Sequence, residues 1–273
     1  MIIVDGHVHI YDCFDVDLLF DSAVENFTQA AEQIGMGREA VSPVLLLTEG
    51  AADPWYGRLR ETVGSKEQGT FTVSAHWDGR FSREMDSLTV SRRDRPEKKL
   101  YLAAGRQVVS AERIEVLALF CSTKIDNGLS LEQTVAAIEQ VGGIPVLPWG
   151  VGKWLGKRGR IIKDFLCSRS KGVLFLGDNG GRPGLWPTPT LFALGREKNM
   201  AVLPGTDPLP LPAEAARVGS FGFYLQEHGQ QQESPIASLQ HALSFGEAEI
   251  FPFGELLKNR VFLANQLRLR FSS

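Results

Sequence analysis

Two histidines near the start of the chain are the residues best suited to chemistry. His7 and His9 follow a β-branched run at residues 2–4. Side chains at positions i and i+2 of an extended segment share one face, so both imidazoles should point the same way from the end of a strand. Imidazole nitrogens are common ligands of divalent transition metals. The pair therefore predicts a metal or catalytic site, and a structural pair held by hydrogen bonds is the alternative.

Other polar residues follow the apolar runs that are typical of strands. Ligands of parallel α/β proteins bind at the carboxyl ends of the strands, so these residues are candidates for the same site. Asp207 can ligate a metal and accept a proton from a bound water, although an aspartate before a proline also suits a plain turn. Glu49 is a further candidate ligand, and two imidazoles with one or two carboxylates suit zinc, manganese or iron. The candidates for substrate binding are Gln107, Lys153, Asp178 and Arg182, of which the two cations also suit an exposed surface.

The composition is that of a globular protein with its own core. Hydrophobic residues make up 43% and charged residues 22% of the 273 residues. This composition allows a full hydrophobic core that needs no stabilisation by metals or disulfides. The net charge of −3 gives no overall signature for nucleic acid or an anionic membrane. No apolar run approaches the roughly 18 residues that span a bilayer. We therefore expect a cytoplasmic protein with neither a nucleic-acid nor a membrane partner.

Short apolar runs alternate with amphipathic segments along the chain. They are typical of buried parallel strands and lie at residues 2–4, 44–47, 100–104, 116–120, 144–147, 173–176 and 201–203. Ser130 and Gln133 form a capping-box pattern that predicts the start of a helix. A repeated strand and helix order gives either a doubly wound sheet or a closed barrel. An α/β barrel of about 250 residues fits this length, so we expect one domain over residues 1–273.

The stretch at about residues 50–99 breaks this alternation. It holds segments of period two at residues 71–76 and 87–90, followed by a charged run at residues 92–99. We interpret it as an inserted hairpin or lid. Its basic residues suit a solvated loop, or alternatively the binding of an anionic substrate.

The layout resembles the polymerase and histidinol phosphatase (PHP) family, and through it the wider group of metal-dependent hydrolases on (βα) barrels. The resemblance follows the family's order over most of the chain. It rests on Asp-Gly-His-Val-His at residues 5–9, Ala-Gly-Arg-Gln at 104–107 with the run at 115–119, the segment 142–147, and Pro-Gly-Thr-Asp at 204–207. It implies an α/β fold, a (βα) barrel of the TIM type in the distorted seven-stranded PHP-like variant, with the inserted segment added.

The chain departs from the family pattern at several ligand positions. The family's Thr-Asp-His, Gly-x-Glu, His-Pro and Asp-x-His are here Thr-Glu-Gly at 48–50, Gly-Arg-Gln at 105–107, Pro-Trp at 148–149 and Asp-Pro-Leu at 207–209. The resemblance therefore implies a degenerate metal site. It retains at most a single divalent ion, held by His7, His9 and Asp207 with Glu49 or Asp178 in addition.

Two functions follow from these expectations. The first is a metal-dependent hydrolase, a phosphoesterase or a related enzyme, in which a metal-activated water attacks a small anionic substrate. His7 and His9 would be ligands in this enzyme, and Asp207 would be a ligand or the catalytic base. The second is a catalytically inactive PHP-like barrel that has lost its metal. It would bind a ligand or regulate a partner through the same end of the barrel. The oligomeric state stays open.

Overall fold

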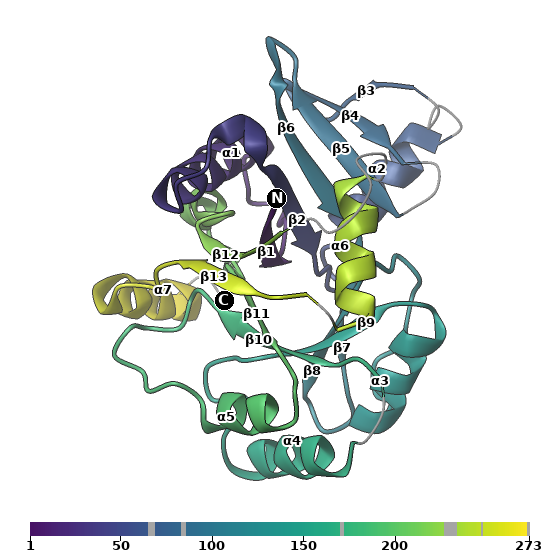
Figure 1. The fold of residues 1–273 in the computed structure, drawn as a ribbon, viewed down its shortest axis with the longest axis vertical. Helices are drawn as coiled ribbons and strands as arrows, with labels where there is room; N and C mark the ends of the chain where they lie inside the picture. The colour runs from purple at the N-terminus through teal and green to yellow at the C-terminus, as the bar shows by residue number, and fades with distance from the viewer. Residues whose placement is uncertain (65–68, 83–85, 170–171, 227–233, 247, 272–273) are drawn as a thin grey trace.

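Two β-sheets with a shared core form the framework of the structure (Figure 1). This structure is a computed structural model that describes residues 1–64, 69–82, 86–169, 172–226, 234–246 and 248–271. The larger sheet has eight strands in the order β13-β12-β1-β2-β6-β5-β4-β3. The smaller sheet has five strands in the order β11-β10-β9-β8-β7.

The strands of the larger sheet are β1 (Ile2–Val8), β2 (Ser42–Leu47), β3 (Phe71–Thr72), β4 (Trp77–Phe81), β5 (Ser87–Arg92), β6 (Arg95–Ala103), β12 (Phe221–Leu225) and β13 (Phe251–Gly254). Those of the smaller sheet are β7 (Gly105–Val109), β8 (Glu115–Leu119), β9 (Ile144–Pro148), β10 (Phe175–Asn179) and β11 (Val202–Gly205). The helices are α1 (Val16–Gln33), α2 (Trp55–Val63), α3 (Leu131–Gln140), α4 (Gly156–Ser168), α5 (Thr190–Glu197), α6 (Pro235–Ser244) and α7 (Asn259–Phe271), with short 3₁₀ helices η1 (Arg38–Ala40) and η3 (Pro212–Arg217). The capping box predicted at Ser130 is present at the start of α3.

Three hydrophobic clusters define the layers. The first joins α1 to one face of the larger sheet, and Phe20 and Trp77 belong to it. The second lies between the two sheets, where Val4 of β1 meets Leu117 of β8 and Leu239 of α6. The third covers the other face of the smaller sheet with α3, α4 and α5, which line the lower edge of the molecule in Figure 1. Successive residues of β1 and β8 contribute to different clusters, as the period of two in a strand requires.

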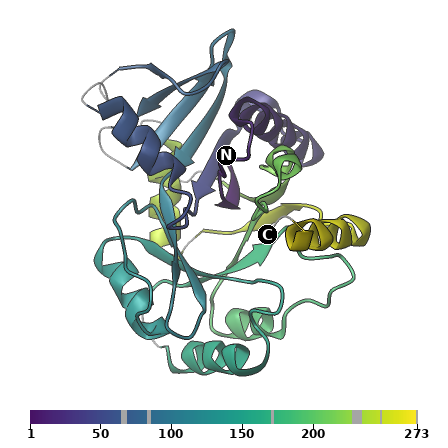
Figure 2. The same cartoon turned by 180° about the vertical axis from the view of Figure 1, so that it is seen from behind.

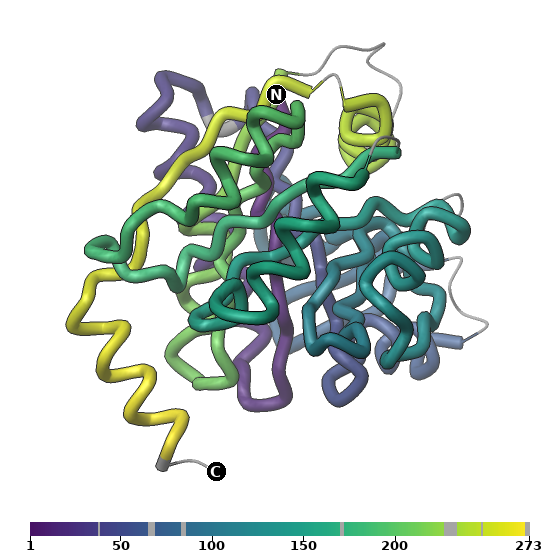
Figure 3. Tube along the Cα trace, turned by 90° about the horizontal axis from the view of Figure 1, so that it is seen from below, coloured from purple at the N-terminus to yellow at the C-terminus, as the bar shows by residue number. Residues whose placement is uncertain are grey.

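Helix α7 lies at the margin of these layers. It occupies one edge of the molecule when seen from behind in Figure 2, and Figure 3 shows it extending away from the body of the chain. Leu263 and Leu267 on this helix are exposed.

The expected TIM-type barrel, in its seven-stranded form or any other, is wrong, because neither sheet closes on itself. β1, β2 and β6 are parallel neighbours, and so are β9, β10 and β11. However, β7 and β8 form an antiparallel hairpin, and β12 runs antiparallel to β1. The segment at 50–99 adds α2 and the antiparallel strands β3, β4 and β5, which extend the larger sheet at one edge. These reversals break the strand and helix alternation that a TIM barrel requires.

The two sheets meet at two seams, which are defined here by the backbone hydrogen bonds that cross them. At the first seam the Asp207 N–H donates to the carbonyl oxygen of His7 at 2.8 Å. At the second the Glu49 N–H donates to the carbonyl oxygen of Gly105 at 3.0 Å, and the Gln107 N–H donates to that of Glu49 at 2.9 Å. The ends of β1 and β2 are thereby held against the smaller sheet.

Glycine permits the close approach at each seam. A Cβ atom on Gly205 would lie 2.2 Å from the backbone nitrogen of His7. A Cβ atom on Gly105 would lie 2.1 Å from the carbonyl oxygen of Leu47. Both distances are far inside van der Waals contact, so any other residue would push the sheets apart.

A buried carboxylate fixes the first seam further. Asp5 on β1 is fully buried and accepts hydrogen bonds from Thr206 through both the backbone N–H (2.8 Å) and the hydroxyl (2.6 Å). It also accepts from the N–H of Gly219 at 2.9 Å. Burial raises the pKa of Asp5 to about 6, while these hydrogen bonds favour its charged form. One side chain thus ties β1 to two segments that lie far away in sequence.

Replacing Gly205 tests the first seam. We expect Gly205→Ala to lower the free energy of unfolding by about 1–3 kcal/mol or more, because the added methyl group overlaps the His7 backbone. Urea denaturation followed by circular dichroism measures the loss. Gly184→Ala is the matched control, since a Cβ there meets nothing within 4 Å, and it should change the stability by less than about 0.5 kcal/mol. Equal stability of the two variants would contradict this account of the seam.

Candidate metal centre

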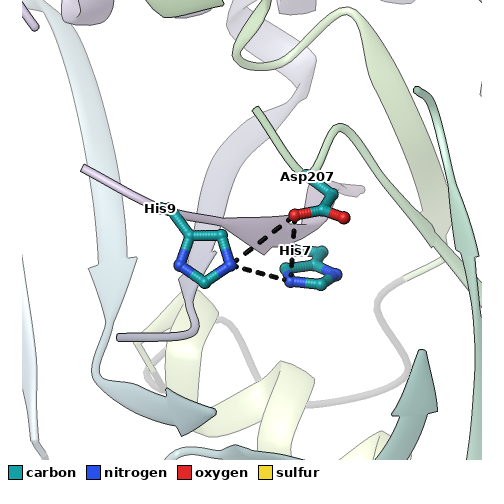
Figure 4. Close-up of side chains that lie close together, drawn as sticks. All are labelled: His7, His9 and Asp207. Atoms are coloured by element: carbon teal, nitrogen blue, oxygen red, sulfur yellow. Dashed lines mark hydrogen bonds and ion pairs between the residues drawn. The ribbon is translucent and has the colours of Figure 1, made fainter. Parts of the chain in front are cut away.

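Three candidate ligands predicted from the sequence converge at the first seam (Figure 4). The Nε2 atoms of His7 and His9 are 3.1 Å apart. Oδ1 of Asp207 lies 3.4 Å from Nε2 of His7 and 3.6 Å from Nε2 of His9. Both histidines are buried, and 24% of the Asp207 side chain is exposed. The group therefore opens to solvent on the aspartate side.

These separations fit a metal ion. In a tetrahedral site with ligand distances of about 2.0–2.1 Å, neighbouring ligand atoms are about 3.3–3.4 Å apart. The three separations in this group, 3.1, 3.4 and 3.6 Å, bracket that value. Two imidazoles and one carboxylate leave a fourth position for water or substrate, as in catalytic rather than structural zinc sites. The donor set suits zinc, manganese or iron.

The backbone of β1 is irregular where it presents the histidines. Asp5 pairs with Leu45 and Val8 with Leu47, so β1 has one residue more than β2 between these pairs. Such a bulge redirects the side chains that follow it. His7 lies within the bulge and His9 directly follows the strand.

Asp207 adopts a backbone conformation that is rare for its type. Its φ angle is 44°, in the left-handed region, and Pro208 follows it. The hydrogen bond from its N–H to His7 holds it there. Strained backbone is concentrated at functional sites, and here it turns the carboxylate towards the imidazoles.

Two amide side chains orient the candidate ligands. Nδ2 of Asn179 donates to Oδ2 of Asp207, while Oδ1 of Asn179 accepts from the N–H of Gly181 at 2.6 Å. The Asn179 amide is therefore fixed, and it leaves Oδ1 of Asp207 for the imidazoles or an ion. The side chain of Gln107 hydrogen-bonds to both His7 and His9. Side chains that hold ligands in this way tune metal affinity.

Further residues at the site have no place among the sequence candidates. The ring of Tyr11 stacks on that of His9, with centroids 5.5 Å apart. Tyr11 is the third member of the alternation that begins with His7 and His9, so the period of two could have identified it. Glu115, at the start of β8, acts electrostatically on His7, and no local motif marks it.

The protonation states favour metal binding near neutral pH. Burial lowers the pKa of both His7 and His9 to about 4. Burial raises the pKa of Asp207, while the nearby His9, Lys153 and Arg217 oppose that shift. The contact between the two Nε2 atoms is a hydrogen bond only if one ring carries its proton on Nε2. A metal ion would take the place of that proton.

Glu49 is not brought into this group. Its side chain is buried at the second seam and accepts a hydrogen bond from the N–H of Tyr56 at the start of α2. Burial raises its pKa to about 7. Its neighbour Thr48 faces the site instead, with Oγ1 3.5 Å from Nε2 of His9. Alternation along the strand end thus directs Glu49 away from the metal group.

The predicted substrate-binding residues differ in their surroundings. Gln107 lies against the histidines, as described above. Lys153 pairs with Glu115, and its charge acts on both histidines and on Asp207. Asp178 and Arg182 form a bidentate ion pair at 2.8 and 2.9 Å, so each already has its partner. The strand end at 178–179 thus contributes Asn179 rather than Asp178 to the ligand group.

The comparisons with known proteins found similar solved structures but no matching sequence family. No family model matches the chain, and no curated protein does. PsfC from Pseudomonas syringae PB-5123 is 14% identical with a TM-score of 0.55, over 98% of each chain. The lesion-specific endonuclease PfuEndoQ from Pyrococcus furiosus is 11% identical with a TM-score of 0.49, and a complex of endonuclease Q with a 27-mer duplex containing an abasic lesion is 12% identical with a TM-score of 0.42. These two alignments cover 92% and 88% of this chain but only 58% and 55% of the endonucleases.

The comparisons bear on the fold alone. The chain shares its overall fold with PsfC, and no family model or sequence match confirms the resemblance to the PHP family. The expectation of a small anionic substrate and no nucleic-acid partner is not borne out by the neighbours, since the endonuclease Q complex contains a DNA duplex. That expectation rests on the net charge of −3, which describes the whole molecule, whereas nucleic-acid binding depends on the local field. None of the helices in the described residues is long and apolar enough to cross a membrane.

The low histidine pKa values give a pH prediction. An ordinary imidazole has a pKa near 6.5, and only neutral imidazole binds a metal. With both pKa values at about 4, we expect metal affinity to stay nearly constant from about pH 7 to about pH 5 and to fall as the pH approaches 4. A competition titration with a chromogenic chelator checks this. Affinity that begins to fall near pH 6.5 would contradict it.

The same groups set one contribution to stability. In the unfolded chain both histidines take up protons near pH 6.5, whereas the folded protein resists protonation down to about pH 4. Their contribution is therefore fully present above pH 6.5 and is lost as the pH falls towards 4.

Asn179 gives a prediction about orientation. We expect Asn179→Ala to weaken metal binding about 10–100-fold, because Asp207 loses the donor that fixes its carboxylate. Isothermal titration with zinc or manganese measures the change. Asn26→Ala is the matched control, since the Asn26 amide donates to backbone carbonyl oxygens of Ala216 and Val218 and to no candidate ligand. Unchanged affinity in Asn179→Ala would remove the orienting role.

Proposed function

We propose that this protein is a metal-dependent hydrolase that cleaves phosphoesters at the first seam. The observation that carries the proposal is the convergence of His7, His9 and Asp207, whose candidate ligand atoms all lie within 4.8 Å of one another. Residues far apart in sequence meet here at separations that suit one divalent ion. The comparison with PsfC supports the fold alone, so the proposed activity is argued from the residues of the site.

The ligands of this ion would be Nε2 of His7, Nε2 of His9 and Oδ1 of Asp207. A bound divalent ion supplies Lewis acidity and lowers the pKa of a coordinated water towards 7. Gln107 and Asn179 keep the ligands in position. Asp207 is the group nearest to solvent in this set, and we assign to it the acceptance of a proton from the attacking water.

Negative charge develops in the transition state of phosphoester cleavage, and a cationic side chain at the site can compensate it. The ammonium group of Lys153 acts on all three ligands and is itself held by Glu115. A positive charge fixed beside the reacting centre stabilises such a transition state. The endonuclease Q structure contains a DNA duplex, so oligonucleotide substrates belong in the first screen.

Metal content is the first test. We expect about one equivalent of a transition metal by mass spectrometry in tag-free protein, and loss of that metal in the double variant His7→Ala/His9→Ala. His76→Ala is the matched control, because His76 is exposed and outside the ligand group, and it should keep the metal. Metal-free protein that fails to take up zinc, manganese or iron would overturn the proposal and favour a binding protein without a metal.

Activity is the second test. Metal-loaded protein is assayed on a chromogenic phosphodiester, a chromogenic phosphomonoester, single-stranded DNA and a duplex with an abasic lesion. We expect Asp207→Asn to lower kcat/KM by at least about 100-fold on any substrate that the parent cleaves, in keeping with the loss of a ligand or base. Cleavage that survives in the double histidine variant would place the chemistry elsewhere.

A further inference from the structure

A cavity at the second seam is separate from the metal group. It has a volume of ≈ 210 Å³ and lies where the end of β2 meets β7 and α2. Its lining includes Glu49, Tyr56, Arg60, Arg106 and Ser122. None of His7, His9 and Asp207 lines it.

The backbone separates the cavity from the metal group. Glu49 and Arg106 form a parallel bridge between the two sheets and both line the cavity. Their chain neighbours Thr48 and Gln107 contact the imidazoles instead. Because neighbouring residues of an extended chain face opposite ways, the metal group and the cavity lie on opposite sides of one seam.

Arg106 supplies unused hydrogen-bond donors to the cavity. Its Nε donates to the carbonyl oxygen of Ser122 at 2.9 Å, which fixes the plane of the guanidinium. Within the described part of the chain, neither terminal nitrogen of Arg106 donates to an acceptor. A fixed guanidinium with free terminal donors is suited to bidentate binding of a carboxylate or phosphate.

A second guanidinium is held at the same cavity. Nη1 of Arg60 donates to Oδ1 of Asp86 at 2.8 Å, and the Arg60 guanidinium carbon lies 6.0 Å from the centroid of the Phe81 ring. Asp86 in turn accepts from the Ser122 hydroxyl at 2.6 Å. Asp86 thereby links Arg60 to the segment that fixes Arg106.

The acidic groups near the cavity are already engaged or exposed. The carboxylate of Glu49 accepts from the N–H groups of Tyr56 and Gly57. Glu61 is exposed, and Asp86 is bound by Arg60 and Ser122. The seam thus already accommodates one carboxylate, that of Glu49, between helix amides and Arg106. This arrangement leaves the terminal N–H groups of Arg106 available to bind a ligand.

We infer that the cavity at the second seam binds an oxyanion, a phosphate or carboxylate group, through the terminal N–H groups of Arg106, with the Arg60 guanidinium adding positive charge beside it. A volume of ≈ 210 Å³ is below the roughly 300–1,000 Å³ of pockets for drug-sized ligands, so the cavity takes the anionic group and few further atoms. This site is distinct from the substrate position at the metal group and does not depend on the proposed hydrolase activity.

Anion binding is tested on metal-free protein, so that an anion bound to a metal cannot contribute. Isothermal titration is carried out with inorganic phosphate, with acetate and with a 5′-phosphorylated dinucleotide. We expect saturable binding to one site that weakens at least tenfold in Arg106→Gln and in Arg60→Gln. Arg196→Gln, which removes an exposed cation on α5, and the double variant His7→Ala/His9→Ala should bind as the parent does.

The outcomes separate this inference from the proposed function. No saturable binding of any probe, or arginine variants that bind within twofold of the parent, would overturn the anion site whatever the metal content. Binding lost in the histidine double variant would also overturn it, since the anion would then lie at the metal group. Tighter binding of the dinucleotide than of phosphate identifies the ligand as the end of a larger molecule, and equal or weaker binding identifies a free anion. Circular dichroism checks that each variant is folded. If Arg106→Gln does not fold, the comparison of Arg60→Gln with the parent tests the inference.

Discussion

The first seam depends on a charged group that is buried completely. Asp5 accepts hydrogen bonds from Thr206 and Gly219 while no part of its side chain reaches solvent. An ionised carboxylate in such a place is stable only if its hydrogen bonds replace those of water. The segments that supply these donors must therefore lie against β1. Because Thr206 precedes Asp207, satisfying Asp5 also sets the position of the candidate ligand opposite the histidines.

The electrostatic character of the site follows from the same burial. His7 and His9 are neutral at physiological pH because the protein interior disfavours their charged forms. Two neutral imidazoles and one partly exposed carboxylate then share a small volume. A divalent cation would compensate the carboxylate and satisfy both nitrogen lone pairs at once.

Much of the framework could be predicted from the sequence. Each of the seven apolar runs overlaps an observed strand, because a continuous run of apolar residues reflects burial on both faces. The candidate pair His7 and His9 was visible because a period of two is a local property. The capping box at Ser130 was local as well.

Other features depend on how distant segments meet. The chain does not close into a barrel because β7 and β8 form a hairpin, and strand direction leaves little trace in a short apolar run. The position of Glu49 depends on which face of the strand end meets α2. Asn179 rather than Asp178 contacts Asp207 because Asp178 is bound by Arg182, a choice between adjacent residues that composition does not reveal.

The way in which the ligands are distributed along the chain has a consequence for biosynthesis. Both histidines lie at the end of the first strand, whereas Asp207 follows the last strand of the smaller sheet. During translation the imidazoles emerge long before the carboxylate, and the seam that unites them forms only after both sheets have been made. A chain interrupted before residue 206 carries two of the three ligands and lacks the donors that Thr206 and Gly219 supply to Asp5. Metal capture would therefore report on completed assembly, and a nascent or truncated chain would leave the ion in the cellular pool.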